Sequence, residues 1–469
     1  MLFNSTEYLI FLPIVFILYW LLKSSYKNQN VLLLISSYVF YGWWDYRFLS
    51  LIIFSSFLDY YVGQKIEAAI GQQNKKHWLL VSLCSNLGLL AIFKYYNFFA
   101  DSFASTMSTV GWEVNDLTLN IILPVGISFY TFQTLSYSID IYRGQIKASK
   151  DIVGFFTFVS LFPQLVAGPI ERASNLIPQI ENKRILNTNL IKTGVFQIFV
   201  GLFRKVAIAD NLGVYVDAVY GNYEVHNGTT LMLATVFYAF QIYFDFSGYS
   251  DIAIGSAKLF GFKFNRNFNL PYFSKTLTEF WRRWHMSLSF WLRDYLYISL
   301  GGNRKGIAIT YRNLLLTMLI GGLWHGSSWN FVIWGGIHGL FLSLEKYTFS
   351  LFKIKTFNAF GYIYTFIVVI IAWIFFRAPD LESASTIVAT LFSFDFGSLF
   401  LGDINKFVNA IFLLIIGLFI DLRLFKSKIS LEEYGARFSV VRLSILVSIL
   451  ILILCLFYST TENFIYFQF

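Results

Sequence analysis

Long apolar segments recur along almost the whole of this chain, and they constrain its fold more than any other feature. A helix that crosses the hydrocarbon core of a bilayer needs about 20 mostly apolar residues. Because 56% of the 469 residues are hydrophobic and only 13% are charged, a soluble core could not bury so many apolar side chains. The candidate segments are residues 8–22, 31–44, 49–62, 78–93, 119–141, 152–167, 190–202, 231–246, 314–323, 331–344, 363–376, 410–420 and 439–457. The sequence therefore predicts an all-α polytopic membrane protein with roughly 11–13 membrane passes.

The start of the chain lacks the features of a cleaved secretory signal. The first apolar segment follows Met1 closely, without a basic region before it, and no small-residue cleavage site precedes Lys23. We therefore interpret this segment as a retained membrane span.

The two cysteines, Cys84 and Cys455, lie far apart within apolar runs. Neither belongs to a CxxC pair or to a Cys/His cluster of the kind that holds zinc. The sequence therefore predicts no disulfide framework and no metal site.

The basic character of the chain, with a net charge of +9, comes from residues scattered over short loops. A nucleic-acid-binding protein would gather them in one patch, so no nucleic-acid partner is expected. Basic loops lie on the cytoplasmic side of a membrane. Because the loops after the first and third segments are basic and the loop after the fourth is acidic, we expect the N-terminus outside the cytoplasm. The charged residues of these loops are Lys23, Lys27, Lys65, Lys75, Lys76, Asp101, Glu113 and Asp116.

No linker, low-complexity tract or internal repeat interrupts this pattern, and the chain has only 7 prolines. We therefore expect one integral membrane domain over residues 1–469. Between residues 241 and 339, polar and charged side chains are mixed with aromatic ones, so we expect the functional site there.

The segment Phe244-Asp-Phe-Ser-Gly-Tyr-Ser-Asp251 places two carboxylates in an otherwise apolar run. Such groups normally face a bundle interior or an aqueous cavity, because inserting an acid at mid-membrane costs about 2.5–3.5 kcal/mol. Hydrogen bonding between helices and lining of a substrate path both explain them. Asp245 and Asp251 would lie about 240° apart on an ideal helix, so we do not expect a catalytic pair.

The segment Phe280-Trp-Arg-Arg-Trp-His-Met-Ser-Leu-Ser-Phe-Trp-Leu-Arg-Asp294 interleaves tryptophan with arginine. This composition is typical of a helix at the membrane interface. It also suits a cytoplasmic pocket, because arginine binds phosphate in bidentate fashion and a coenzyme A or carrier-protein donor is rich in phosphate. The candidates for donor binding are Trp281, Arg282, Arg283 and Trp284.

The segment Gly321-Gly-Leu-Trp-His-Gly-Ser-Ser-Trp-Asn-Phe-Val-Ile-Trp-Gly-Gly-Ile-His-Gly339 contains two histidines. A histidine in an apolar span is usually a structural hydrogen-bond donor. The glycines on both sides of His325, however, allow close approach of a substrate or a neighbouring helix. Its imidazole, with an ordinary pKa of about 6.5, also suits proton abstraction from an alcohol near neutral pH. On a continuous helix His338 would lie about 220° away, so the two histidines need not converge.

Several enzyme classes lack their motifs in this chain. Gly248-Tyr-Ser250 continues with Asp251-Ile252 and is therefore no nucleophile elbow, and residues 301–306 precede isoleucine instead of the lysine of a P-loop. No histidine is followed five residues later by aspartate. We therefore do not expect a serine hydrolase, an ATPase or an acyltransferase of the soluble type.

In their order along the chain, these motifs resemble those of the membrane-bound O-acyltransferase (MBOAT) family. The resemblance is to the alginate O-acetyltransferase-like branch, which also contains D-alanyl transfer proteins of teichoic acid, and it covers nearly the whole chain. It rests on the three segments above together with Met1-Leu-Phe-Asn-Ser, Leu161-Phe-Pro-Gln-Leu-Val-Ala-Gly-Pro-Ile-Glu-Arg172, Trp373-Ile-Phe-Phe-Arg-Ala378 and Phe464-Ile-Tyr-Phe-Gln-Phe469.

This resemblance implies a ring of tilted helices around a thinned centre, with a funnel on each side of the membrane. It implies that His325 is the catalytic histidine where the funnels meet, and that His285 is the second catalytic candidate. It also implies an acyl thioester as donor, expected to be acetyl-CoA or an acyl-carrier thioester, and no permanently bound cofactor.

We therefore expect transfer of an acetyl group from a cytoplasmic thioester across the bacterial inner membrane. The acceptor would be a hydroxyl of an extracellular polysaccharide or of a periplasmic acetyltransferase partner protein. His325 would act as general base, and the arginine-rich segment would hold the donor near the inner mouth. D-alanyl transfer from a carrier protein to a cell-wall polymer is the alternative within the family. A membrane transporter is the alternative outside it, because intramembrane acids also mark substrate paths.

Overall fold

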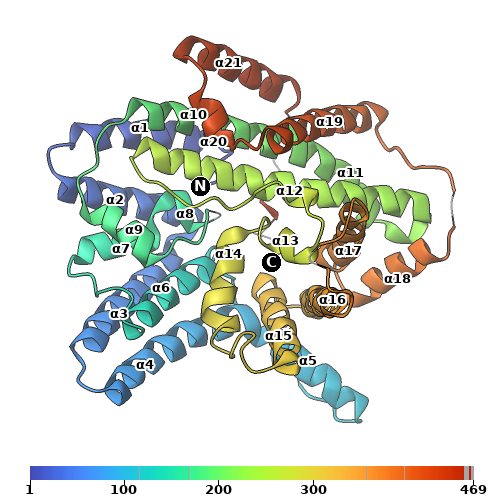
Figure 1. Cartoon of the computed structure of the whole chain (residues 1–469), viewed down its shortest axis with the longest axis horizontal. Helices are drawn as coiled ribbons and strands as arrows, with labels where there is room; N and C mark the ends of the chain where they lie inside the picture. Colours follow the sequence, from blue (N-terminus) through green and yellow to red (C-terminus); the bar gives the residue numbers. More distant parts are fainter. Residues whose placement is uncertain (116, 167, 355, 396, 459–463, 466–469) are drawn as a thin grey trace. The chain divides into compact units, whose positions relative to one another are not determined.

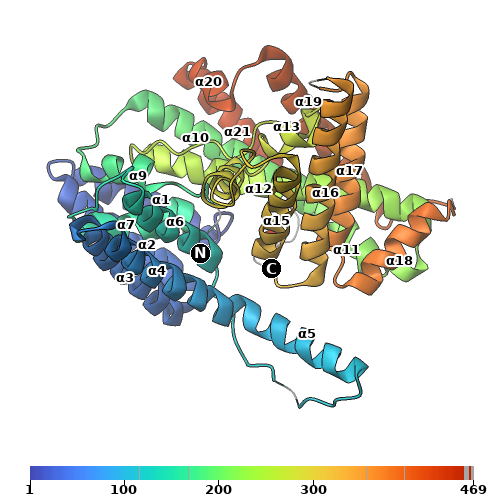
Figure 2. The same ribbon diagram turned by 60° about the horizontal axis from the view of Figure 1, so that its bottom comes forward.

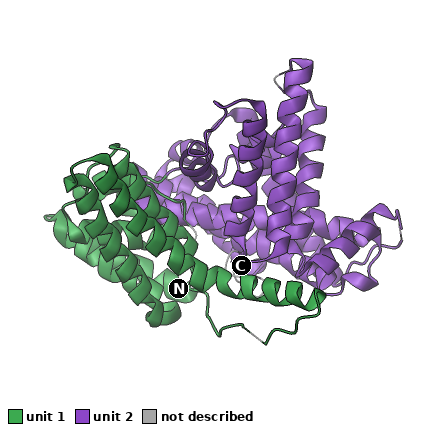
Figure 3. Ribbon diagram, turned by 90° about the horizontal axis from the view of Figure 1, so that it is seen from below, with its two compact units in different colours: residues 1–187, 259–264 green, residues 188–258, 265–469 purple. Residues whose placement is uncertain are grey.

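The computed structural model describes residues 1–115, 117–166, 168–354, 356–395, 397–458 and 464–465. Within these ranges all regular secondary structure is helical, which confirms the all-α prediction. Contacts divide the chain into two compact units, residues 1–187 with 259–264 and residues 188–258 with 265–469 (Figure 3). The expectation of a single domain over residues 1–469 stays a prediction.

Unit 1 is built from helices that precede residue 188 (Figure 1). They are α1 (Thr6–Leu21), α2 (Tyr26–Asp45), η1 (Tyr46–Phe48), α3 (Leu49–Ala68), α4 (Gln72–Leu90), η2 (Ala91–Tyr95), α5 (Tyr96–Thr109), α6 (Ile127–Tyr142), α7 (Ile152–Ser160), α8 (Phe162–Leu165) and α9 (Ala173–Glu181). Serine side chains cap the first two: Ser5 accepts from the N–H of Tyr8, and Ser25 accepts from that of Asn28.

One predicted span of unit 1 is wrong in its first part. Residues 119–126 were expected to be helical, but α6 begins only at Ile127. Pro124 lacks a backbone N–H, and Gly126 has a left-handed φ of 78°, so neither continues a helix. A Cβ atom at Gly126 would also clash with the carbonyl of Leu165, so this turn needs glycine.

Unit 2 contains the helices from residue 188 onward. They are α10 (Thr188–Leu202), η3 (Phe203–Ala209), α11 (Asp210–Tyr220), η4 (Tyr223–Val225), α12 (Gly228–Leu259), η5 (Pro271–Phe273), α13 (Leu277–Trp281), α14 (Met286–Trp291), η6 (Leu292–Tyr297), α15 (Ile307–His325), α16 (Trp329–Phe352), α17 (Phe360–Arg377), α18 (Leu381–Phe392), α19 (Ile404–Ser427), α20 (Leu431–Ala436) and α21 (Val440–Leu456). The segment singled out between residues 241 and 339 therefore lies mainly in unit 2.

The outer faces of several helices are apolar, as expected for helices in contact with lipid. On α19, large apolar side chains recur every three or four residues and are 52–59% exposed: Val408, Phe412, Ile415 and Phe419. Exposing such an apolar stripe to water is unfavourable, whereas contact with the hydrocarbon of a bilayer is favourable.

Length and composition identify candidate membrane spans among the described residues. Four helical stretches meet both criteria, namely Gln72–Thr109, Ile307–His325, Phe360–Arg377 and Ile404–Ser427, and shorter apolar helices are Thr6–Leu21, Ile152–Leu165, Leu381–Phe392 and Val440–Leu456. These helices support a multi-pass membrane protein. The expectation of roughly 11–13 passes and the central thinned ring stay predictions.

Glycines allow α15 and α16 to pack closely. A Cβ atom at Gly322 would clash with the carbonyl of Phe331, and one at Gly335 would clash with the carbonyl of Met318. Figure 2 shows α15, α16 and α17 running side by side. The glycines near His325 thus admit a neighbouring helix, as the sequence suggested. His325 is the last residue of α15 and α16 begins at Trp329, so the angle calculated for one continuous helix does not apply to His325 and His338.

Candidate active site

His325 is buried at the C-terminal end of α15, with 3% of its surface exposed. Aromatic rings surround it: the ring centroids of Trp324, Trp334 and Phe376 lie 5.1, 4.9 and 5.4 Å from that of His325. The imidazole of His285 lies 6.2 Å away. The two histidines, which lie 40 positions apart in the sequence, therefore lie near one another in the fold.

His285 lies between α13 and α14, and backbone hydrogen bonds of its neighbours fix its position. It has a left-handed φ of 40°, which is unusual for a residue other than glycine and often marks a functional position. The N–H of the next residue, Met286, donates to the carbonyl of Asn267 at 2.8 Å, and the Asn267 side chain accepts from Ser287. His285 is fully buried, and its ring lies 4.6 Å from that of Phe246.

Two side chains on one face of α16 fix the position of α13. Glu345, which is 2% exposed, accepts the N–H groups of Leu277 and Thr278 at 2.7 and 3.2 Å and the Thr278 hydroxyl at 2.7 Å. Two turns earlier, Nδ1 of His338 accepts the indole N–H of Trp281 at 3.3 Å. Because α13 leads directly into the turn that carries His285, this pair sets the geometry of the histidine.

We expect Glu345→Ala to lower both stability and activity. The first turn of α13 would lose the acceptor for its N–H groups, which generally costs about 0.5–2 kcal/mol, and His285 would lose its fixed position. Thermal unfolding in mild detergent and acyl-transfer rates measure the two effects. Glu113→Ala, which removes an exposed carboxylate, is the control and should leave both unchanged. Equal behaviour of the two variants would contradict this role of Glu345.

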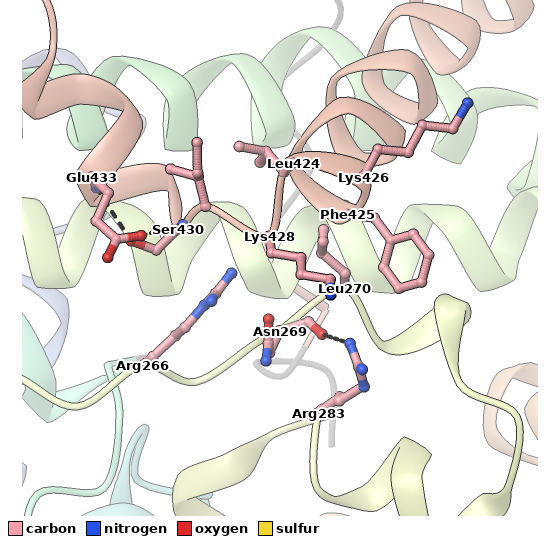
Figure 4. A pocket seen from close by; sticks show the side chains of 11 residues that line it. Arg266, Asn269, Leu270, Arg283, Leu424, Phe425, Lys426, Lys428, Ser430 and Glu433 are labelled. Atoms are coloured by element: carbon pink, nitrogen blue, oxygen red, sulfur yellow. Dashed lines mark hydrogen bonds between the residues drawn. The ribbon is translucent and has the colours of Figure 1, made fainter.

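A basic cavity of about 620 Å³ lies in unit 2 (Figure 4). Its lining residues are Arg266, Asn269, Leu270, Arg283, Leu424, Phe425, Lys426, Lys428, Ile429, Ser430 and Glu433. The lining thus includes four cationic residues and one carboxylate. Hydrogen bonds from the N–H and hydroxyl of Ser430 hold the pKa of Glu433 below its ordinary value, so it is ionised at neutral pH. In Figure 4, Arg266, Arg283 and Lys428 surround Asn269, whereas Lys426 points away.

The cavity and His285 are joined by two paired backbone segments. The N–H of Asn269 donates to the carbonyl of Arg283 at 2.8 Å, and the N–H of Met286 donates to the carbonyl of Asn267 at the same distance. Arg283 also donates through Nη1 to the Asn269 carbonyl at 3.2 Å. The arginine in the cavity wall and the buried histidine are therefore only two residues apart on one fixed segment. The segment that lines the cavity through Arg283 therefore also carries His285.

The acids of α12 have partners in separate buried ion networks. Asp245 lies 2.7 Å from Lys205, whereas Asp251 lies 2.7 Å from Arg204, which also contacts Asp421 at 2.8 Å. Asp245 and Asp251 thus have different cationic partners. This arrangement is the interhelical pairing that the sequence offered as one explanation of these acids.

The four donor-binding candidates separate in the structure. The segment that contains them is not one interface helix, because α13 ends at Trp281 and α14 begins at Met286. Trp281 and Trp284 are buried at 8% and 0% exposure, Arg283 lines the basic cavity, and Arg282 is exposed and does not line it. Binding of the donor by any of the four, Arg283 included, stays a prediction.

Sequence patterns alone did not identify several residues of the site. Arg266 and Lys428 are far apart in the chain and meet only at the cavity, so no local motif joins them. Glu345 lies in an apolar helix as an isolated acid, which was the one available signal that it has a buried partner. Trp334 lies within the segment that contains His325 and His338, but its contact with His325 depends on the packing of α15 against α16.

Residues 145–383 match the family model described as MBOAT, membrane-bound O-acyltransferase family. Probable alginate O-acetylase AlgI of Pseudomonas putida is 43% identical over 87% of this chain and 83% of its own length. The chain belongs to the membrane-bound O-acyltransferase family. It is therefore an O-acyltransferase embedded in a membrane.

Other relatives of this MBOAT protein are named for a different acceptor polymer or a different transferred group. Peptidoglycan O-acetyltransferase of Helicobacter pylori is 38% identical over 82% of this chain and 78% of its own length. Teichoic acid D-alanyltransferase of Bacillus subtilis is 29% identical over 49% of this chain and 60% of its own length. Likeness to the O-acetylating proteins thus covers much more of the chain than likeness to the D-alanyl protein.

Proposed function

We propose that this protein transfers an acetyl group from a cytoplasmic acetyl-CoA across the bacterial inner membrane to a hydroxyl acceptor. The observation that carries this proposal is the hydrogen-bonded segment that joins the basic cavity to His285, whose ring lies 6.2 Å from that of His325. Phosphates of the donor bind to Arg266, Arg283 and Lys428, and the acyl thioester extends toward His285 and His325.

The charge distribution of unit 2 supports a cytoplasmic donor. The C-terminal end of α19 and the residues after it carry Arg423, Lys426, Lys428 and Arg437, whereas the other end of this helix is preceded by Asp403. Basic membrane-flanking segments lie on the cytoplasmic side. The cavity, which includes Lys426 and Lys428, therefore opens to the compartment where acetyl-CoA is made.

At the buried end of the path, His325 acts as general base toward the acceptor hydroxyl. An imidazole can accept the proton as the hydroxyl oxygen attacks the thioester carbonyl, a role that generally contributes about 10²–10⁴ in rate. His285 lies on the opposite side of the reacting group and orients it. The acceptor is an extracellular polysaccharide or the hydroxyl of a periplasmic partner protein.

A label-transfer assay with purified enzyme shows whether acetyl-CoA or a D-alanyl carrier protein is the acyl donor. Radiolabelled acetyl-CoA or D-alanyl carrier protein is supplied with deacetylated alginate as the probe acceptor. Our proposal predicts label transfer from acetyl-CoA and none from the D-alanyl carrier. Transfer from the carrier alone would replace this proposal by D-alanyl transfer. Absence of transfer from either, in protein shown to be folded, would contradict direct acetyl transfer from acetyl-CoA to this polysaccharide.

Lys428→Glu should weaken donor binding and leave the chemical step largely unchanged. A hydrogen bond to a charged group contributes about 1.5–3 kcal/mol, so KM for acetyl-CoA should rise about 10-fold to 100-fold. Initial rates at varied acetyl-CoA separate this effect from kcat. Lys406→Glu reverses the same charge near the other end of α19 and should leave KM unchanged. An equal KM for both variants and wild type would remove the cavity from the donor site.

A further inference from the structure

Trp334 combines two properties that bear on the reaction. Its indole ring meets the ring of His325 edge to face, with centroids 4.9 Å apart and planes at 84°. The residue is 1% exposed, yet its indole N–H has no hydrogen-bond partner among the described residues. Buried donors are normally paired, so an unpaired N–H beside a candidate general base calls for an explanation.

Two neighbouring tryptophans, Trp373 and Trp281, differ from Trp334 because their indole N–H groups have acceptors. The indole N–H of Trp373 donates to the hydroxyl of Tyr272 at 3.2 Å, and that of Trp281 donates to His338. Among the described residues the indole N–H of Trp284 also has no partner, but its ring packs against those of Phe268 and Trp373. Trp334 is therefore a buried side chain with an unpaired donor, and its ring packs against that of His325.

Acyl transfer creates a need for such a donor. As the acceptor oxygen bonds to the thioester carbon, the hydroxyl proton passes to His325 and the carbonyl oxygen becomes an oxyanion. The carbonyl then re-forms, the carbon–sulfur bond breaks, and His325 returns the proton to the leaving thiolate. Stabilising the oxyanion requires a donor about 2.7–3.1 Å from it.

We propose that the indole N–H of Trp334 donates a hydrogen bond to this oxyanion. The inference rests on the proposed acyl transfer at His325 and adds a second catalytic group to it. Of the three rings that surround His325, that of Phe376 has no donor, whereas those of Trp324 and Trp334 each carry an indole N–H. Trp334 is 1% exposed, and a hydrogen bond is strong in such a water-excluded setting.

The packing around Trp334 fixes this donor before the substrate arrives. The next residue, Gly335, lies against the backbone of Met318 on α15. The indole also packs against the rings of Trp373 and Phe376, with centroids 5.9 and 5.3 Å away. A donor held in this way needs no reorganisation when the oxyanion forms.

An isosteric substitution removes the indole N–H while it keeps the shape of the ring, and so separates the effect of the donor from that of packing. Benzothienylalanine, which carries sulfur in place of the indole N–H, is incorporated at position 334 of the full-length protein, and Trp334→Phe serves as a second variant. Loss of one oxyanion donor generally reduces kcat about 10²-fold to 10³-fold, so both variants should show that loss with KM for acetyl-CoA nearly unchanged. The same isostere at position 373 should change kcat only a few-fold, because that N–H is already engaged with Tyr272.

The outcomes separate this inference from the proposed function. Transfer that depends on His325 but continues at near wild-type kcat in the position-334 isostere would overturn the role of Trp334 alone. An equal loss in the position-373 isostere would show that packing and not the donor is responsible, and would also overturn it. Absence of acetyl transfer by folded wild-type protein would overturn the proposed function and this inference together.

Discussion

His325→Gln is expected to abolish most acyl transfer while the protein remains folded. Glutamine has polar atoms near the positions of the imidazole nitrogens, but it cannot accept a proton near neutral pH. Removal of general-base catalysis should lower kcat by about 10²–10⁴. Because His325 lies inside an aromatic enclosure and not on the donor cavity, KM for acetyl-CoA should change little. Initial-rate kinetics with purified enzyme measure both quantities.

The matched control for this prediction is His77→Gln. His77 is exposed on α4 in unit 1 and contacts neither the basic cavity nor the aromatic enclosure. It should retain wild-type kcat and KM. A His325→Gln protein with near wild-type kcat would show that His325 is not the base.

Arg204→Met is expected to cause the largest loss of stability. Arg204 lies between Asp251 and Asp421 with 9% of its side chain exposed, so methionine would leave two buried carboxylates without their cation. Removing one partner of a buried ion pair generally costs about 3–5 kcal/mol. Thermal unfolding in mild detergent should show a large decrease in Tm or a failure of the folded protein to accumulate.

Two further variants test the cause of this loss. Asp251→Asn and Asp421→Asn added to Arg204→Met should recover part of the stability, because neutral amides remove the uncompensated charges. Arg293→Met breaks the exposed pair with Asp294, for which the expected cost is about 0–1 kcal/mol. Similar losses in Arg204→Met and Arg293→Met would contradict the burial argument.

Much of the fold follows from local sequence properties. Apolar segments of helical length predicted the helical class, because a chain in lipid must satisfy its backbone hydrogen bonds within each segment. Helix boundaries were predicted less well where a turn depends on distant contacts. At Gly126 the left-handed turn fits against the carbonyl of Leu165, a partner that no local pattern reveals.

In the candidate site, too, some features were predictable from local sequence and others depend on tertiary contacts. His325 and His285 were predicted as members of the site, and their rings lie 6.2 Å apart. Their contact depends on the glycine-mediated packing of α15 on α16 and on the strained turn at His285, which are tertiary features. The cavity likewise joins Arg283 to Lys428 across a long stretch of chain. Motifs therefore predicted the two histidines whose rings the structure brings together, whereas the residues around them and along the cavity became visible only through the packing of unit 2.

Sided transfer in proteoliposomes tests the central claim most directly. The protein is reconstituted with radiolabelled acetyl-CoA on the face that carries Lys428 and a hydroxyl acceptor on the other, with orientation established by accessibility of a cysteine placed in the α19–α20 connection. We predict that label reaches the acceptor across an intact bilayer with wild-type protein and His77→Gln, and not with His325→Gln. Label that reaches only acceptors on the donor side, or that crosses equally well with His325→Gln, would contradict transmembrane acetyl transfer at His325.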